Sequence, residues 1–265
     1  MHLFPRWHRL RVLRNHPIPD GLWFELTPRL PLLHGLDAIE RARLRELSTL
    51  FLHDKHFTGV QGLELSEEMR LVIAAQACLP ILELGPDAYA GWVEIVVYPA
   101  AFRVSREVTD EFGIVHREER GLSGESWGAG PVILAWEEVE RDSFRLRHGH
   151  NVVVHEFAHK LDLLNGRANG LPPLHPDMPI EAWSRALGEA YERLIRRIEQ
   201  HHRPFIDPYA ATDPAEFFAV VCEYFFTAPE VLQEHCPAVY EQLRRYFRQD
   251  PLQRLRQAAR GERTR

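Results

Sequence analysis

The stretch Asn151-Val-Val-Val-His-Glu-Phe-Ala-His-Lys-Leu-Asp-Leu-Leu-Asn-Gly166 decides the fold that we expect for this chain. Its apolar residues recur at helical spacing and it ends in the stop signal Asn-Gly, so the pattern predicts one buried helix over Val152 to Leu164. His155 and His159 stand four residues apart. Both imidazoles therefore leave the same face of the helix, where they can converge on a single metal ion.

Glu156 directly follows His155 and completes an H-E-x-x-H sequence. In zinc peptidases two neutral imidazoles in this arrangement bind Zn²⁺, and the glutamate acts as general base. Five letters also match by chance, but here three polar side chains share a helix of Val, Phe, Ala and Leu. Their burial is costly unless something such as a metal ion pairs them. The alternative is a helix whose histidines hydrogen-bond to carbonyl groups while Glu156 faces solvent.

The composition is that of a folded protein, with 45% apolar and 26% charged residues among 265. We expect one unit over residues 1–265, in which residues 1–90 are mainly helical and residues 91–265 hold the sheet and the metal-binding helices. A formal charge of −6 without a long basic block does not indicate a nucleic-acid partner. Because no apolar run reaches membrane-spanning length and no signal-peptide core is present, we expect a cytoplasmic protein without a membrane partner.

The cysteines Cys78, Cys222 and Cys236 are far apart and odd in number. They predict neither a disulfide framework nor a C-x-x-C metal site, and each is expected to be a small core residue. The basic run from Arg254 to Arg265 predicts a solvated helix end followed by a frayed tail.

The first 35 residues show no sustained period and predict an extended segment packed on the body of the protein. Apolar residues from Leu36 to Phe57 follow a helical stripe. A second helix is expected from Ser66, whose hydroxyl can cap it, through Cys78, with its end at Pro80.

After this helix the spacing of apolar residues changes from about 3.6 residues to 2, which indicates strands. Trp92 to Tyr98 and Pro131 to Trp136 predict single strands, and Phe102 to Val108 with Ile114 to Arg120 predict a hairpin. The expected fold class is α+β: mainly helical, with a small mixed or antiparallel sheet packed on the H-E-x-x-H helix.

The glycine-rich segment before the last strand has two interpretations. Gly128 to Trp136 could form an exposed sheet edge that pairs with an extended substrate. Alternatively, its glycines occupy positions of a loop that need positive φ. Further along, Ile180 to His201 predicts a long amphipathic helix. The adjacent His201 and His202 diverge on that helix and are expected to lie at the surface rather than to chelate one ion.

A catalytic zinc site needs a third protein ligand beside two imidazoles. The segment from Thr212 to Phe226 predicts an almost wholly apolar helix, capped by Thr212 or Asp213, whose interior charges are Glu216 and Glu223. A buried carboxylate needs a partner, and a metal ion supplies one. The alternative, two glutamates on an exposed face, conflicts with the Phe and Val residues around them.

Tyr209 lies in the loop that leads into this helix, so we expect its hydroxyl at the same end of the cleft. Glu216 is near that loop, at the helix start, and is our candidate ligand. Glu223 lies two turns deeper, where it could steady a histidine or pair with an arginine. Asp162 could orient a ligand in the same way, or pair with Lys160 or an arginine.

Taken together, these motifs resemble those of the Mlc titration factor A family. The resemblance rests on Val-Val-Val-His155-Glu156-Phe-Ala-His159-Lys-Leu-Asp162, Tyr209-Ala-Ala-Thr-Asp-Pro-Ala-Glu216-Phe-Phe-Ala-Val, Glu223-Tyr-Phe-Phe and Leu122-Ser-Gly-Glu-Ser-Trp-Gly-Ala-Gly-Pro-Val-Ile-Leu-Ala-Trp136. It implies a zincin-like fold related to the catalytic domain of anthrax lethal factor. It also implies zinc-dependent aminopeptidase activity on peptides and, in enteric bacteria, binding of the glucose-responsive repressor Mlc.

By this resemblance, His155, His159 and Glu216 match the zinc ligands of one ion per chain, Glu156 the general base, and Tyr209 the residue that stabilises the transition state. An Mlc-like repressor is a further expected partner. The rival interpretation is a non-catalytic binding protein that sequesters a transcriptional repressor, with a structural or vestigial metal site. The presence of Glu156 and Tyr209 favours catalysis, because neither is required to hold zinc.

Overall fold

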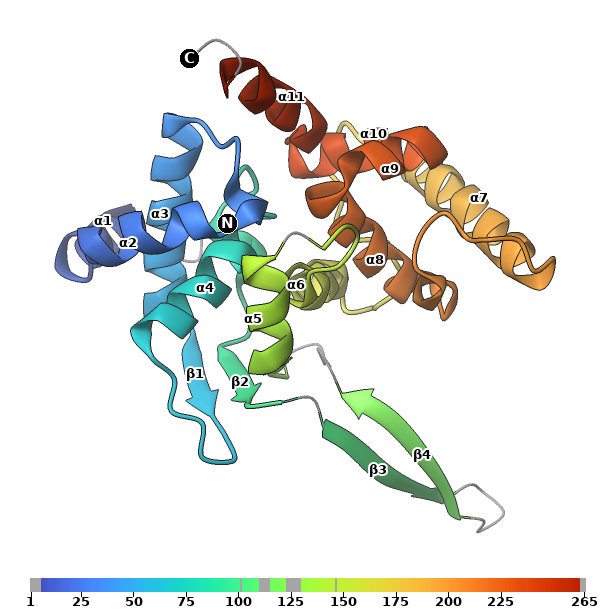
Figure 1. Cartoon of the computed structure of the whole chain (residues 1–265), viewed down its shortest axis with the longest axis horizontal. Helices are drawn as coiled ribbons and strands as arrows, with labels where there is room; N and C mark the ends of the chain where they lie inside the picture. Colours follow the sequence, from blue (N-terminus) through green and yellow to red (C-terminus); the bar gives the residue numbers. More distant parts are fainter. Residues whose placement is uncertain (1–5, 101, 110–114, 123–129, 146, 263–265) are drawn as a thin grey trace.

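A computed structural model describes residues 6–100, 102–109, 115–122, 130–145 and 147–262 of the chain (Figure 1). The α-helices are α1 (Arg6–Asn15), α2 (Asp20–Leu26), α3 (Ala38–Asp54), α4 (Glu67–Cys78), α5 (Trp136–Phe144), α6 (Val152–Asp162), α7 (Ile180–Glu199), α8 (Pro214–Thr227), α9 (Pro229–His235), α10 (Pro237–Phe247) and α11 (Pro251–Glu262). The strands are β1 (His56–Gly59), β2 (Glu94–Tyr98), β3 (Phe102–Thr109), β4 (Val115–Leu122) and β5 (Val132–Ala135). The mainly helical α+β class expected from the sequence is confirmed.

The central sheet is parallel throughout, in the order β1-β2-β5. The expected mixed or antiparallel pairing was therefore wrong for this sheet. The sequence pattern assigned Phe57 to the end of a helix, so strand β1 was missed. The connection from β1 through α4 to β2, which returns the chain to the same end of the sheet, was therefore missed as well. Connections of this kind join parallel strands. The chain returns between β2 and β5 through the β3–β4 hairpin instead of a helix.

The predicted hairpin is confirmed, because β3 and β4 pair antiparallel from Phe102 opposite Leu122 to Thr109 opposite Val115. In Figure 1 it projects away from the helices. The expected substrate-binding edge falls partly on residues 123–129, which lie outside the described residues. Its remainder forms β5, which stands at one end of the strand order.

The amino-terminal segment is helical, so the expected extended conformation was wrong. Helix α1 packs on α3, yet Val12 is its one buried hydrophobic residue among the described side chains, so its periodic signal was weak. Helix α2 buries Trp23 and Leu26. An ion pair of 2.7 Å between Arg9 and Asp87 ties α1 to the body of the protein.

The carboxyl-terminal helices α9, α10 and α11 each start with a proline at the first helical position, where its missing N–H costs nothing. Arg254 was expected in a solvated helix end, but it is buried: its Nη2 donates to Glu40 Oε1 at 2.8 Å and to Gln249 Oε1 at 3.1 Å. Glu40 belongs to the capping box of α3, so α11 closes onto the amino-terminal helices.

Helix α6 joins the two halves of the core. Phe157 is fully buried and contacts the rings of Phe51, Tyr89 and Trp92, with centroid distances of 5.5, 5.1 and 5.7 Å. Helix α6 also packs along α8. The three cysteines are buried and free, as expected. Among the described helices none is both long and apolar enough to cross a membrane.

Candidate active site

The start of α6 is fixed by hydrogen bonds to two other helices. Asn151 caps the helix, with its Oδ1 accepting from Val154 N at 2.9 Å. Its side-chain amide donates to Gln76 Oε1 on α4 at 2.7 Å, and its backbone N–H donates to Glu223 Oε2 on α8 at 2.5 Å. The direction in which the α6 histidines project is therefore set by α4 and α8. Sequence reasoning missed this network, because Gln76 and Asn151 are 75 residues apart.

The structure brings together all three of the expected ligand side chains. The Nε2 atoms of His155 and His159 are 3.2 Å apart, and Glu216 Oε2 lies 3.1 Å from the first and 3.5 Å from the second. A tetrahedral site with metal–ligand bonds of about 2.0–2.1 Å spaces its ligand atoms about 3.3–3.4 Å apart. The three distances therefore match the edges of such a site.

The carboxylate of Glu216 supports the same interpretation. Asp213 caps α8 by accepting from the backbone N–H groups of Ala215 and Glu216, which places Glu216 in the first turn. Glu216 Oε2 is buried and has no hydrogen-bond partner among the described residues, although two imidazole nitrogens approach it closely. The hydrogen bond between the two Nε2 atoms leaves this oxygen unpaired, so the convergence of the three atoms fits a cation better than it fits a hydrogen-bond network.

His155 lies between two carboxylates, because its Nδ1 is 2.8 Å from Glu223 Oε1. Burial alone would lower the pKa of His155, but the carboxylates of Glu216 and Glu223, each close to one of its ring nitrogens, outweigh burial and raise that pKa well above its usual range. Burial also opposes ionisation of Glu216, yet the two histidines hold its pKa well below its ordinary value. The carboxylates of Glu216 and Glu223 therefore favour a positive charge at this position.

Glu156 faces the cavity beside this cluster. Its side chain is buried, and Oε2 has no hydrogen-bond partner in the part of the chain that the structure describes. Burial raises the pKa of Glu156, while the neighbouring histidines act in the opposite direction. The cavity has a volume of about 240 Å³ and is also lined by His155, Tyr209 and Glu223. A buried carboxylate with a raised pKa beside a metal site suits a group that exchanges protons.

Tyr209 belongs to the short 3₁₀ helix η5 (Pro208–Ala211), which the Asp207 side chain caps by accepting from Tyr209 N at 2.8 Å. The tyrosine is 54% exposed, and its ring centroid is 6.2 Å from that of His155. Burial and the charges of Glu216 and Glu156 raise the pKa of its phenol, so the hydroxyl stays protonated. It can therefore donate a hydrogen bond into the cavity.

Asp162 accepts hydrogen bonds from the backbone of the loop that follows α6. Its Oδ2 accepts from Gly170 N at 2.7 Å, and Gly170 O accepts from Trp183 Nε1 at 2.9 Å. Gly170 has φ +74°, and a Cβ there would lie 2.6 Å from Pro214 O. Asp162 therefore fixes the loop after α6 against the start of α8. Lys160 donates to Gly130 O at 2.7 Å.

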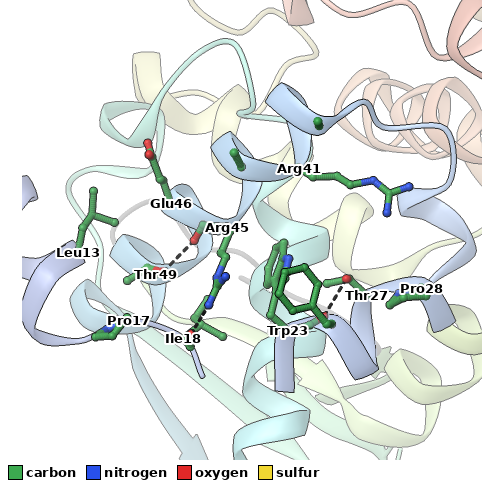
Figure 2. Close-up of a pocket in the computed structure, with 13 residues that line it drawn as sticks. Leu13, Pro17, Ile18, Trp23, Thr27, Pro28, Arg41, Arg45, Glu46 and Thr49 are labelled. Carbon is green, nitrogen blue, oxygen red and sulfur yellow. Dashed lines mark hydrogen bonds between the residues drawn. The ribbon is translucent and has the colours of Figure 1, made fainter. Parts of the chain in front are cut away.

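A larger cavity lies elsewhere, between α1, α2 and α3 (Figure 2). It encloses about 550 Å³ and is mostly apolar. Its hydroxyl groups are used internally: Thr27 donates to Trp23 O and Thr49 to Arg45 O, each at 2.8 Å. This cavity contains no residue of the metal cluster. A second cluster of possible ligands, His8, His53 and Asp54, lies on α1 and α3, away from Glu156 and Glu216.

Comparison with known proteins identifies the family to which the chain belongs. The model of the family described as glucose-regulated metallo-peptidase M90 matches residues 4–248. The chain belongs to the M90 family of metallopeptidases. Its match spans α6 and α8, so the M90 assignment includes the whole candidate metal cluster.

Several relatives cover nearly the whole chain. Mlc titration factor A of Serratia proteamaculans is 44% identical over 229 residues, which are 85% of this chain and 86% of that protein. Mlc titration factor A of Salmonella arizonae is 42% identical over 253 residues, covering 94% and 98%. An uncharacterized protein of Synechocystis is 41% identical over 253 residues, covering 94% and 92%. The expected resemblance is confirmed.

Proposed function

We propose that this M90 family member is a zinc-dependent aminopeptidase in which His155, His159 and Glu216 hold one zinc ion per chain. The observation that carries the proposal is the convergence of two Nε2 atoms and one buried carboxylate oxygen at 3.1–3.5 Å from one another. Imidazole and carboxylate donors suit Zn²⁺, and two histidines with one glutamate leave a fourth position open. When bound, zinc lowers the pKa of water and polarises the peptide carbonyl.

The remaining groups supply proton transfer and charge stabilisation. Glu156 accepts the proton of the attacking water and then delivers it to the leaving amine. Tyr209 donates its hydroxyl proton in a hydrogen bond to the oxygen on which negative charge develops. Glu223 accepts from His155 Nδ1 and so presents His155 Nε2 to the cation.

The test is a comparison of purified wild-type protein with Glu156→Gln. Wild type should contain about one zinc by elemental analysis and hydrolyse alanine 4-nitroanilide. Glu156→Gln should keep the zinc and lose turnover by about 10²- to 10⁴-fold, the usual contribution of a general base. Glu137→Gln is the matched control, because Glu137 is an exposed glutamate of α5. Full activity of Glu156→Gln would overturn the assignment of Glu156 as general base. A wild-type protein that cannot take up zinc would overturn the proposal that the chain is a zinc-dependent enzyme.

A second function is supported by the relatives named Mlc titration factor A. We propose that this chain also binds an Mlc-like transcriptional repressor. Large apolar side chains are exposed on the amino-terminal helices, at Trp7 (64%), Leu10 (58%) and Phe24 (66%). These offer apolar contact area separate from the metal cluster.

This second proposal is tested by pull-down of a purified Mlc-like repressor. Glu156→Gln should retain binding if the interaction is independent of the chemistry. The double variant Trp7→Ser, Phe24→Ser should weaken binding and retain hydrolysis of alanine 4-nitroanilide. Absence of any interaction with wild type, in the presence and absence of zinc, would reject it.

A further inference from the structure

The cavity beside the metal cluster carries more negative than positive charge. Its lining includes five carboxylates, among them Glu156, and two guanidinium groups, Arg141 and Arg147. Such a lining favours a ligand with a cationic group. Which carboxylate could bind that group depends on which of them is already paired.

Two of the carboxylates already accept hydrogen bonds with both oxygens. Glu223 accepts from His155 Nδ1 with one oxygen and from Asn151 N with the other. Asp142 accepts from Arg147 Nη1 at 2.7 Å with Oδ1, and from Val152 N, at the start of α6, at 3.3 Å with Oδ2. Both carboxylates therefore anchor α6.

Asp207 accepts from Tyr209 N with Oδ1, and its side chain is 32% exposed, so water can satisfy Oδ2. Glu138, in the first turn of α5, is different. Its Oε1 is 3.7 Å from Arg141 Nη2, beyond hydrogen-bonding distance, and its Oε2 is buried with no partner among the described residues. An incompletely paired carboxylate in a partly desolvated position is costly unless a donor completes it.

The dimensions of the cavity restrict what that donor can be. A volume of about 240 Å³ corresponds to a sphere about 8 Å across, which Glu138 lines together with His155 and Glu156. In a peptide whose first carbonyl is attacked, the terminal nitrogen is two bonds from the carbonyl carbon, or about 2.5 Å away. The α-ammonium group of a substrate bound at the metal cluster can therefore enter this cavity, where its three N–H donors can complete the pairing of Glu138.

We propose that Glu138 binds the α-ammonium group of the substrate's first residue and so selects peptides with a free amino terminus. This inference rests on the proposed aminopeptidase function. Glu138 then determines specificity and does not take part in the bond-breaking step. A blocked terminus would bring an amide in place of a charge and would leave the Glu138 carboxylate unpaired.

The first test compares wild type, Glu138→Gln and the control Glu137→Gln, each loaded with zinc. With alanine 4-nitroanilide, Glu138→Gln should lower kcat/KM by about 10- to 150-fold, the range expected for loss of a charged hydrogen bond. Glu137→Gln should match wild type. Glu138→Asp, which keeps the charge, should recover part of the loss. Unchanged kcat/KM in Glu138→Gln would overturn the proposal.

The second test measures binding without turnover. Trialanine and N-acetyl-trialanine are titrated calorimetrically into zinc-loaded Glu156→Gln protein, with and without Glu138→Gln. Trialanine should bind more tightly than its acetylated form, and its affinity should fall above about pH 8 as the α-amine loses its proton. Both effects should vanish with Glu138→Gln.

The two tests separate failure of the inference from failure of the proposed function. A wild type that holds zinc but hydrolyses no anilide would reject the aminopeptidase, while the titrations would still decide the role of Glu138. Equal binding of both peptides, or a pH dependence that survives Glu138→Gln, would overturn the inference even in an active enzyme.

Discussion

Glu223→Gln should weaken zinc binding although Glu223 does not belong to the metal cluster. The Glu223 carboxylate accepts from His155 Nδ1 at 2.8 Å and from Asn151 N at 2.5 Å, and the residue is 6% exposed. A glutamine of the same shape has one acceptor oxygen, so one of these two donors loses its partner, and His155 loses a charged neighbour. Loss of such a hydrogen-bonding partner typically costs 10- to 100-fold in metal affinity, or about 1.4–2.7 kcal/mol.

The assay is competition for zinc with a chromophoric chelator. Glu230→Gln is the matched control, because Glu230 follows on α9 with a side chain 51% exposed. Urea unfolding of the metal-free proteins separates an effect on the site from an effect on the fold, because an unpaired Asn151 N–H would also cost about 1–3 kcal/mol of stability. A zinc dissociation constant of Glu223→Gln within threefold of wild type would refute the reasoning.

Three further results are expected. Tyr209→Phe should lower kcat by about 10²- to 10³-fold with unchanged zinc content, since it removes a donor to the developing oxyanion; steady-state kinetics within threefold of wild type would contradict this. Zinc uptake at pH 7 should release about one proton, because the raised pKa of His155 keeps it protonated in the metal-free protein, and affinity should rise with pH; calorimetry in two buffers of different ionisation enthalpy measures this. Protonated His155 also contributes to the free energy of unfolding of the metal-free protein. This contribution is fully present below about pH 6.5, the pKa of an unfolded histidine, and is lost as pH rises through the raised pKa of His155. Phe157→Ala should cost about 3–5 kcal/mol in urea unfolding, whereas Leu164→Ala, at a position 40% exposed, should cost little.

The helices that carry the site could be predicted because their signals are local. The apolar period from Val152 to Leu164 gives α6 followed by a short 3₁₀ turn, and the segment from Thr212 gives α8, which starts at Pro214. The spacing of His155 and His159 fixes their common face without any knowledge of the tertiary structure. The assignments of catalytic and ligand roles, and of residues 1–265 as one unit, stay predictions.

Other features depend on contacts that a linear pattern does not contain. Strand β1 has only four residues and gains its stability from pairing with β2, which lies more than thirty residues further on. Residues 6–26 have few buried side chains per turn, so α1 depends on packing against α3, and α2 on packing against α4. The link from Gln76 through Asn151 to Glu223 joins three helices, and none of its members stands out in the sequence.

The same link explains how the three expected ligand side chains come together. Helices α6 and α8 are held by buried apolar residues such as Phe157 and Phe218, and the Asn151 hydrogen bonds fix how far α6 can turn against α8. The unpaired oxygens of Glu216 and Glu156 are the cost of this arrangement, because the fold holds both carboxylates ready for groups that the protein itself does not supply.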